Sequence, residues 1–94
     1  MATAHSILCA DDDRVRVSTL TFADGAETGY HRHAYDYLVV PVTGGTFRVE
    51  EADGSTRELT QMPGEPYQGP AGTEHNVVNV SGTTVSFVEV EFKR

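Results

Sequence analysis

The chain has 94 residues, with 14 acidic residues, 7 lysines and arginines, and a formal net charge of −7 at pH 7. A chain of this length can build one hydrophobic core, so we expect a single domain over residues 1–94. The acidic residues are scattered along the chain. This excess of negative charge argues against nucleic acid or an anionic membrane as a partner.

Signals for a membrane or secreted protein are not recognised in the sequence. No apolar run approaches the roughly 20 residues needed to span a bilayer. The first ten residues, MATAHSILCA, lack the basic start and long apolar core of a signal peptide. Cys9 is the single cysteine, which excludes an internal disulfide and a zinc site made of thiolates. We therefore expect a cytoplasmic protein.

The N-terminal part of the chain is predicted to contain a lead-in followed by a strand. We expect residues 1–13 to form the lead-in, with a short edge strand at residues 7–8, and His5 to be a surface histidine. Residues 14–22, RVRVSTLTF, alternate along the chain and are rich in β-branched side chains, which favours a strand.

The middle of the chain predicts a further strand and a hairpin. Residues 37–42, YLVVPV, favour a strand, and we expect Pro41 at an edge or a bulge because proline has no N–H to donate. Residues 46–51 and 55–60 flank Asp53-Gly54, a dipeptide typical of a tight hairpin turn.

The C-terminal third predicts a loop and two strands. Residues 62–72, MPGEPYQGPAG, hold three of the four prolines and predict a looping connection with a short strand at residues 67–68. Residues 75–80 and 83–92 favour strands, and the second alternates so that Glu89 faces opposite to its neighbours. No segment has helical periodicity. Eight to ten short strands predict an all-β sandwich or barrel.

Three histidines fall in two of these segments. His31 and His33 lie at the centre of residues 25–44, GAETGYHRHAYDYLVVPVTG. Residues two apart in an extended strand share a face, so these two rings point the same way and make half of a metal site. His75 follows a Pro-x-Gly turn in residues 70–79, PAGTEHNVVN. Three histidines that reach one barrel interior from separate strands would outline a binding cavity.

The spacing around these histidines forms two motifs, at residues 25–44 and 64–79. The members of the first are Gly25, His31, His33 and Gly44. The members of the second are Gly64, Pro70, Gly72, His75 and Asn79.

These motifs resemble the paired motifs of the cupin superfamily. The first family motif is a Gly, five residues, His-x-His, three or four residues, Glu, six residues and Gly, and only its Glu is missing here. The second is a Gly, five residues, Pro-x-Gly, two residues, His, three residues and Asn, and it is present in full. The segment HRHAYDYLVVPVTGG, residues 31–45, is also similar to segments of small single-domain bacterial cupins, some of them labelled as β-alanine degradation proteins.

The resemblance implies a double-stranded β-helix, which is a jelly-roll barrel, with one divalent transition metal in its lumen. The family's metal ligands carry over to His31, His33 and His75. Imidazole suits iron, zinc, nickel, manganese and copper, and among these we favour iron. Three nitrogens would occupy one side of the ion and leave the other positions open to water or substrate.

The family's Glu position is filled by Tyr37. If no carboxylate binds, three neutral imidazoles leave the ion its full charge, which favours anionic substrates with two donor atoms. Tyr37, our candidate catalytic residue, could be a weak ligand, a hydrogen-bond donor to bound substrate or oxygen, or part of the cavity wall. Asp36, turned inward by a bulge, and Glu89 on the last strand are alternative carboxylate ligands.

The sequence thus supports three hypotheses for function. The first is a metal-dependent enzyme acting on a small organic acid or diketone-like substrate, either by dioxygenase-type chemistry or as a non-redox isomerase, cyclase or hydrolase. The second is a non-catalytic module that binds or senses a small ligand or metal, and the third is an accessory or storage role. Apolar outer strand faces also predict a homodimer.

Overall fold

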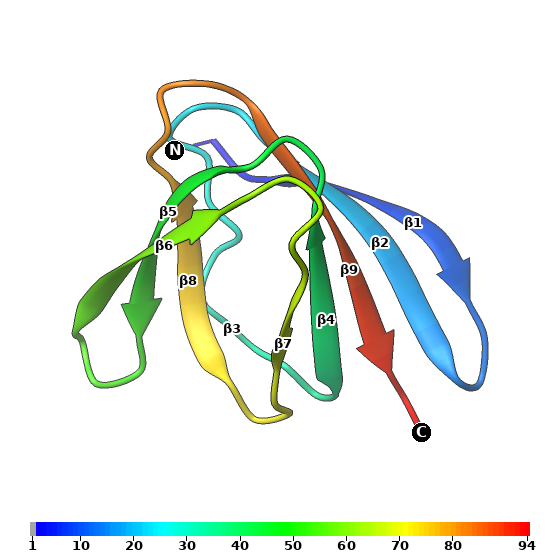
Figure 1. Cartoon of the computed structure of the whole chain (residues 1–94). Coiled ribbons are helices and arrows are strands. Elements are labelled where there is room, and N and C mark those ends of the chain that lie inside the picture. Colours follow the sequence, from blue (N-terminus) through cyan, green and yellow to red (C-terminus); the bar gives the residue numbers. More distant parts are fainter. Residues whose placement is uncertain (1) are drawn as a thin grey trace.

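The structure, a computed structural model, describes residues 2–94. Within that range the chain forms nine strands and no helix (Figure 1). The strands are β1 (His5–Asp11), β2 (Val15–Phe22), β3 (His31–Arg32), β4 (Asp36–Pro41), β5 (Gly45–Glu51), β6 (Thr56–Gln61), β7 (Tyr67–Gly69), β8 (Glu74–Asn79) and β9 (Val85–Phe92). Over residues 2–94 we therefore find no helix long and apolar enough to cross a membrane.

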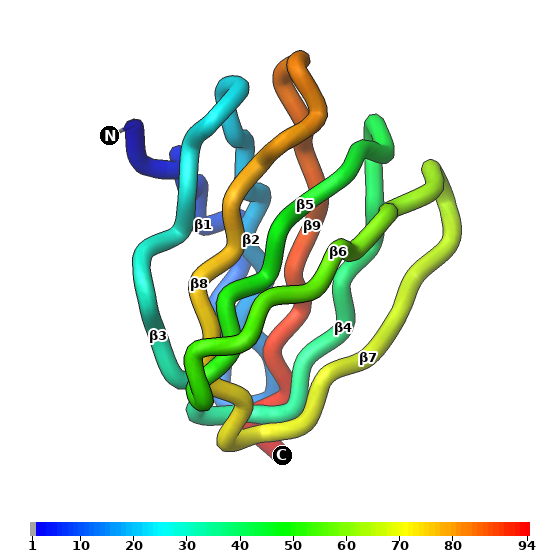
Figure 2. The backbone as a smooth tube through the Cα atoms, turned by 90° about the vertical axis from the view of Figure 1, so that its left-hand side faces the viewer, coloured from blue at the N-terminus to red at the C-terminus, as the bar shows by residue number. Residues whose placement is uncertain are grey.

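The strands form two antiparallel sheets that face each other (Figures 1 and 2). One has five strands in the order β1-β2-β9-β4-β7, and the other has four in the order β3-β8-β5-β6. Strands far apart in sequence are neighbours, because β9 lies between β2 and β4, and β8 lies between β3 and β5. This is the double-stranded β-helix that the resemblance to the cupins implied.

Most predicted strands are confirmed. The strand within the N-terminal lead-in is longer than predicted. The hairpin of β5 and β6 turns at residues 52–55, and β7 is the short strand expected within the proline-rich loop. The short edge strand expected at residues 7–8 was wrong in length, because β1 pairs with β2 from His5 to Asp11, with a bulge between Leu8 and Ala10. Every β1 residue is exposed, so no alternation of apolar and polar residues marks this strand in the sequence. His5 is exposed, as predicted.

Pro41 ends β4 inside the five-stranded sheet instead of on an edge strand. It pairs with Phe87 of β9, while the ladder to β7 stops at Val39. On the side of β4 that faces β7, no strand lies beside Pro41, so no hydrogen bond is lost there by the missing N–H. Locally, Pro41 occupies an edge, which agrees with the physical reason for the prediction.

The packed core closes one end of the barrel. Phe22, Phe47 and Phe87 contact one another with ring centroids 5.1–5.9 Å apart, and the first two are fully buried. Asn79, at the end of β8, is also fully buried beside them. Because β8 is only six residues long, His75 at its start lies toward the opposite end. The interior at that end is left for a site.

Candidate metal centre

Backbone pairing brings the three histidines together. His31 in β3 pairs directly with His75 in β8. His33 follows β3, outside the strand, so the prediction that both residues lie in one strand was wrong. Its amide donates to the carbonyl of Thr73 and its carbonyl accepts from the amide of Gly72, both at 2.8 Å. Both rings nevertheless line one cavity, as the two-residue spacing predicted.

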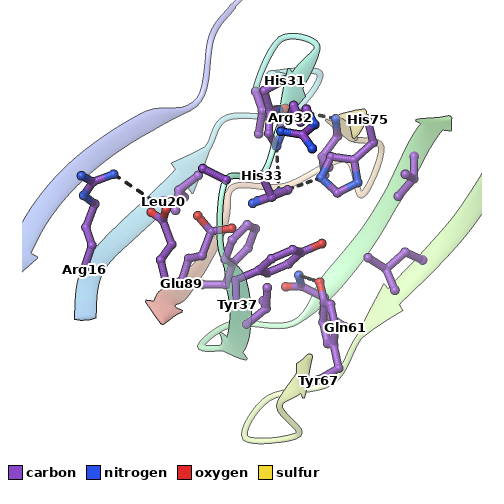
Figure 3. Close-up of a pocket in the computed structure, with 18 of the residues that line it drawn as sticks. Arg16, Leu20, His31, Arg32, His33, Tyr37, Gln61, Tyr67, His75 and Glu89 are labelled. Atoms are coloured by element: carbon purple, nitrogen blue, oxygen red, sulfur yellow. Dashed lines mark hydrogen bonds and ion pairs between the residues drawn. The ribbon is translucent and has the colours of Figure 1, made fainter. Parts of the chain in front are cut away.

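The Nε2 atoms of the three rings converge on one point (Figure 3). Those of His31 and His33 are 3.0 Å apart, and those of His33 and His75 are 3.1 Å apart. A ring nitrogen offers one proton or one lone pair in the ring plane, so Nε2 of His33 cannot satisfy two neighbours by hydrogen bonding. A cation shared by three lone pairs would satisfy all of them.

The surroundings of the rings favour the neutral form that binds metal. Nδ1 of His31 lies 2.8 Å from the carbonyl of Gly29. A carbonyl only accepts, so this nitrogen carries the proton and Nε2 keeps its lone pair. Burial, together with the neighbouring histidines, lowers the pKa of His33 and of His75 to about 4. Both rings are therefore uncharged at neutral pH.

The spacing of the nitrogens fits a divalent transition metal. At metal–nitrogen distances of about 2.0–2.1 Å, two ligand nitrogens are about 2.9 Å apart at a right angle and about 3.3 Å apart at a tetrahedral angle. The two measured separations, 3.0 and 3.1 Å, lie between these values. Among residues 2–94, this trio is the one cluster of potential metal ligands, with its ligand atoms within 4.8 Å of one another.

Tyr37 lies against the cluster. Its ring stacks on His33, with centroids 3.9 Å apart and planes 18° from parallel. The side chain is 7% exposed, and burial raises the pKa of its phenol, so the hydroxyl keeps its proton. A Cβ atom on Gly69, the residue paired with Tyr37 in β7, would overlap the phenol ring. Only a glycine there lets the ring occupy this position.

The two alternative carboxylates differ in position. Asp36 is exposed and accepts a hydrogen bond of 2.8 Å from the amide of Ala71, so the strand is regular and this carboxylate faces away. Glu89 lines the same cavity as the histidines but is not part of their cluster. The structure therefore groups three histidines without a carboxylate.

A comparison with known protein families matches residues 18–91 to the cupin domain. The chain belongs to the cupin family. The β-alanine degradation protein BauB of Pseudomonas aeruginosa is 48% identical over 83 residues, which cover 88% of this chain and 86% of BauB. Among solved structures, a cupin domain from Bordetella pertussis Tohama I is 41% identical with a TM-score of 0.94, over 99% of this chain and 96% of the other.

More distant cupins share the fold alone. The polyketide cyclase RemF of Streptomyces resistomycificus has a TM-score of 0.73 at 23% identity, over 99% of this cupin and 69% of RemF. The resemblance predicted from the two histidine motifs is thus confirmed.

The histidines of this cupin open onto a cavity of about 370 Å³ between the two sheets. A cavity of this volume suits a small molecule. Its polar wall includes residues that sequence reasoning did not single out. Gln61, at the end of β6, donates a hydrogen bond of 2.9 Å to the hydroxyl of Tyr67. Arg16 of β2 lies 3.8 Å from Glu91 of β9. No local sequence pattern predicts these pairs, because each depends on how separate segments are aligned in the fold.

Proposed function

We propose that this cupin is a metal-dependent enzyme that binds a small organic substrate at a divalent transition metal held by His31, His33 and His75. The observation that carries the proposal is the convergence of three Nε2 atoms on one side of an internal cavity. Three neutral ligands leave the ion its charge and its remaining coordination positions. Those positions suit a small organic acid or a diketone-like substrate with two oxygen donors.

Iron is the metal we favour, with zinc, nickel, manganese and copper as alternatives. Bound iron would supply dioxygenase-type chemistry, because it can hold substrate and oxygen at neighbouring open positions. In this proposal Tyr37 has the catalytic role of donating a hydrogen bond from its neutral phenol to bound substrate or oxygen. Its stacking on His33 and its fit over Gly69 support that role.

The similarity to BauB supports the choice of substrate class. That relative is named for β-alanine degradation and is 48% identical to this chain. We therefore propose short organic acids of three or four carbon atoms, and amino acids of the same size, as the first compounds to test.

A non-redox isomerase or cyclase is the second candidate. Burial and the neighbouring Glu91 raise the pKa of Glu89 to about 7, so its carboxyl can both hold and release a proton at neutral pH. A group with that property in the same cavity suits proton transfer on a metal-bound substrate. This chemistry would proceed at the same rate without oxygen.

Elemental analysis of protein expressed without a metal-binding tag tests the proposal. We expect close to one equivalent of transition metal in the parent, and none in a variant with His31, His33 and His75 changed to alanine. His5→Ala is the matched control, because His5 is exposed on β1 and should not affect metal content. Absence of metal in the parent, even after reconstitution, would contradict the proposal.

Activity is then measured as oxygen uptake with short acids and diketones. Uptake that depends on all three histidines supports dioxygenase-type chemistry, whereas turnover that is independent of oxygen supports the isomerase or cyclase. A metal-loaded protein that binds these compounds without converting any of them would be a binding or sensing module.

The homodimer and the cytoplasmic location stay predictions. Half-buried apolar side chains cover the outer face of the five-stranded sheet, where Val17 and Leu38 flank Val90. We propose that a second copy covers this face. A monomeric mass in solution, measured by light scattering, would contradict the dimer.

A further inference from the structure

The cavity wall contains a second group of polar side chains outside the histidine cluster. Gln61 is 3% exposed, and its Oε1 atom is buried without a hydrogen-bond partner among residues 2–94. The nitrogen of the same amide donates to the hydroxyl of Tyr67, which fixes the orientation of the amide. A buried acceptor left without a donor costs free energy, so this oxygen is suited to a donor on a ligand.

Glu89 is the second unsatisfied group in this wall. Its half-buried carboxylate has no ion-pair or hydrogen-bond partner in the part of the chain that the structure describes. Three arginines line the cavity. Arg16 pairs with Asp11 and Glu91, and Arg57 pairs with Glu51. The third, Arg32, is exposed beside the histidines, and none of the three pairs with Glu89. A positively charged group of a ligand could therefore form an ion pair with Glu89.

Sheet register places these groups on one wall. Val39 of β4 pairs with Glu89 of β9 on one side and with Tyr67 of β7 on the other. The three residues therefore form a row across neighbouring strands, with about 10 Å between its outer members. All three line the cavity. The charge of Glu89 also helps to raise the pKa of Tyr67, although burial is the larger cause.

Figure 3 shows Tyr37 between the histidine cluster and the pair made by Gln61 and Tyr67. We propose that Gln61, Tyr67 and Glu89 form a subsite for the amino group of the substrate, at a distance from the metal. This inference rests on the proposed function, in which the metal holds the acid group. The metal and this subsite together would select a short carboxylic acid that carries an amino group at its other end.

Chemistry supports this occupant over an anion or an apolar group. The carboxylate of Glu89 and the free oxygen of Gln61 are both acceptors, and an ammonium group offers three donors and a positive charge. An anion at this end of the cavity would instead meet the negative charge of Glu89, which pairs with no arginine. An apolar group would leave the oxygen of Gln61 buried without a partner and would cover the half-buried carboxylate of Glu89.

The test compares three acids of equal length on zinc-loaded protein by titration calorimetry. The probes are 3-aminopropanoate, 3-hydroxypropanoate and propanoate. We expect the amino acid to bind about 10- to 100-fold more tightly than propanoate, with the hydroxy acid between them. Glu89→Gln and Gln61→Met should each lower this preference, measured as the ratio of the affinities for the amino acid and for propanoate, about 10-fold or more. Glu58→Gln is the matched control for charge, because Glu58 is exposed on β6.

Equal affinities of the three acids for the parent would overturn the subsite, and so would a preference that survives both variants. Zinc content is measured on every sample, so failure of the metal site is seen separately. If the parent holds no zinc, the proposed function fails, and propylamine is titrated into the metal-free protein while the side-chain amide of Gln61 is followed by NMR. A shift that is absent in Glu89→Gln would support the subsite, and no shift would refute it.

Discussion

Replacing Asn79 with alanine should strongly destabilise the fold without touching the histidines. The amide nitrogen of Asn79 lies 2.7–3.2 Å from the carbonyls of Phe22, Ala23 and Thr83. Its oxygen accepts a hydrogen bond of 2.9 Å from the amide of Ser81. The side chain thus joins the end of β2 to the turn between β8 and β9, at a fully buried position.

The magnitude follows from the bonds that are lost. An amide nitrogen has two protons, so Asn79 satisfies at least two carbonyls and one amide at once. At about 1 kcal/mol or more for each partner left unsatisfied, the variant should lose about 3–4 kcal/mol. Domains are typically stable by only about 5–15 kcal/mol. The melting temperature should therefore fall by more than about 12 °C.

Urea unfolding followed by circular dichroism measures this loss, with Asn76→Ala as the matched control. Asn76 lies on the same strand at 7% exposure, but its side chain makes fewer hydrogen bonds. Its nitrogen donates to Glu50 at 2.8 Å, and its oxygen accepts a long hydrogen bond of 3.4 Å from the hydroxyl of Thr28. We expect a loss of about 1 kcal/mol for this control. Similar losses for the two variants, or a loss below about 1.5 kcal/mol for Asn79→Ala, would refute the reasoning.

Three further predictions concern the site. Gly69→Ala should push the Tyr37 ring off His33 and lower the stability of the fold by about 1–3 kcal/mol. Denaturant unfolding measures the loss of stability, and the NMR shifts of the His33 ring report the movement of Tyr37. Unchanged shifts would contradict this prediction. Metal-free protein should lose stability as the pH falls from about 6.5 to about 4, because His33 and His75 bind protons in the unfolded chain before they do so in the folded one. Thermal melts across this range should show a steeper loss for the parent than for His33→Phe. Burial raises the pKa of Glu89 to about 7, so this residue favours the folded state at low pH and opposes it as the pH rises from about 4.5 through 7. Glu89→Gln should therefore gain stability relative to the parent at pH 8 and little at pH 4, and a difference independent of pH would count against the burial of this carboxyl.

The fold and the histidine cluster could be predicted because their signals are local. The spacing of His31 and His33 and the turn before His75 are readable over a few residues, and the structure brings the three rings together. The strand expected around His33 was wrong, since β3 ends at Arg32 and the backbone of His33 bonds to the turn at Gly72 and Thr73 before β8. No window of sequence contains that partner.

The opposite wall could not be predicted in the same way. Glu89 and Tyr67 lie on the same wall, on either side of β4, because Val39 pairs with both. Gln61 reaches Tyr67 across a proline-containing loop, so their contact follows no strand or helix period. The exposed β1 strand was also underestimated, because its stability comes from its ladder with β2 and not from an apolar face.

Two backbone hydrogen bonds hold residue 33 in place independently of its side chain. Main-chain atoms of Gly72 and Thr73 fix where residue 33 lies, and they would do so for many other side chains. A single substitution there, such as His33→Glu, can change the charge and hardness of the ligand set while the barrel keeps its shape. Because the backbone of residue 33 is held independently of its side chain, the set of potential metal ligands can be varied at this position by single substitutions.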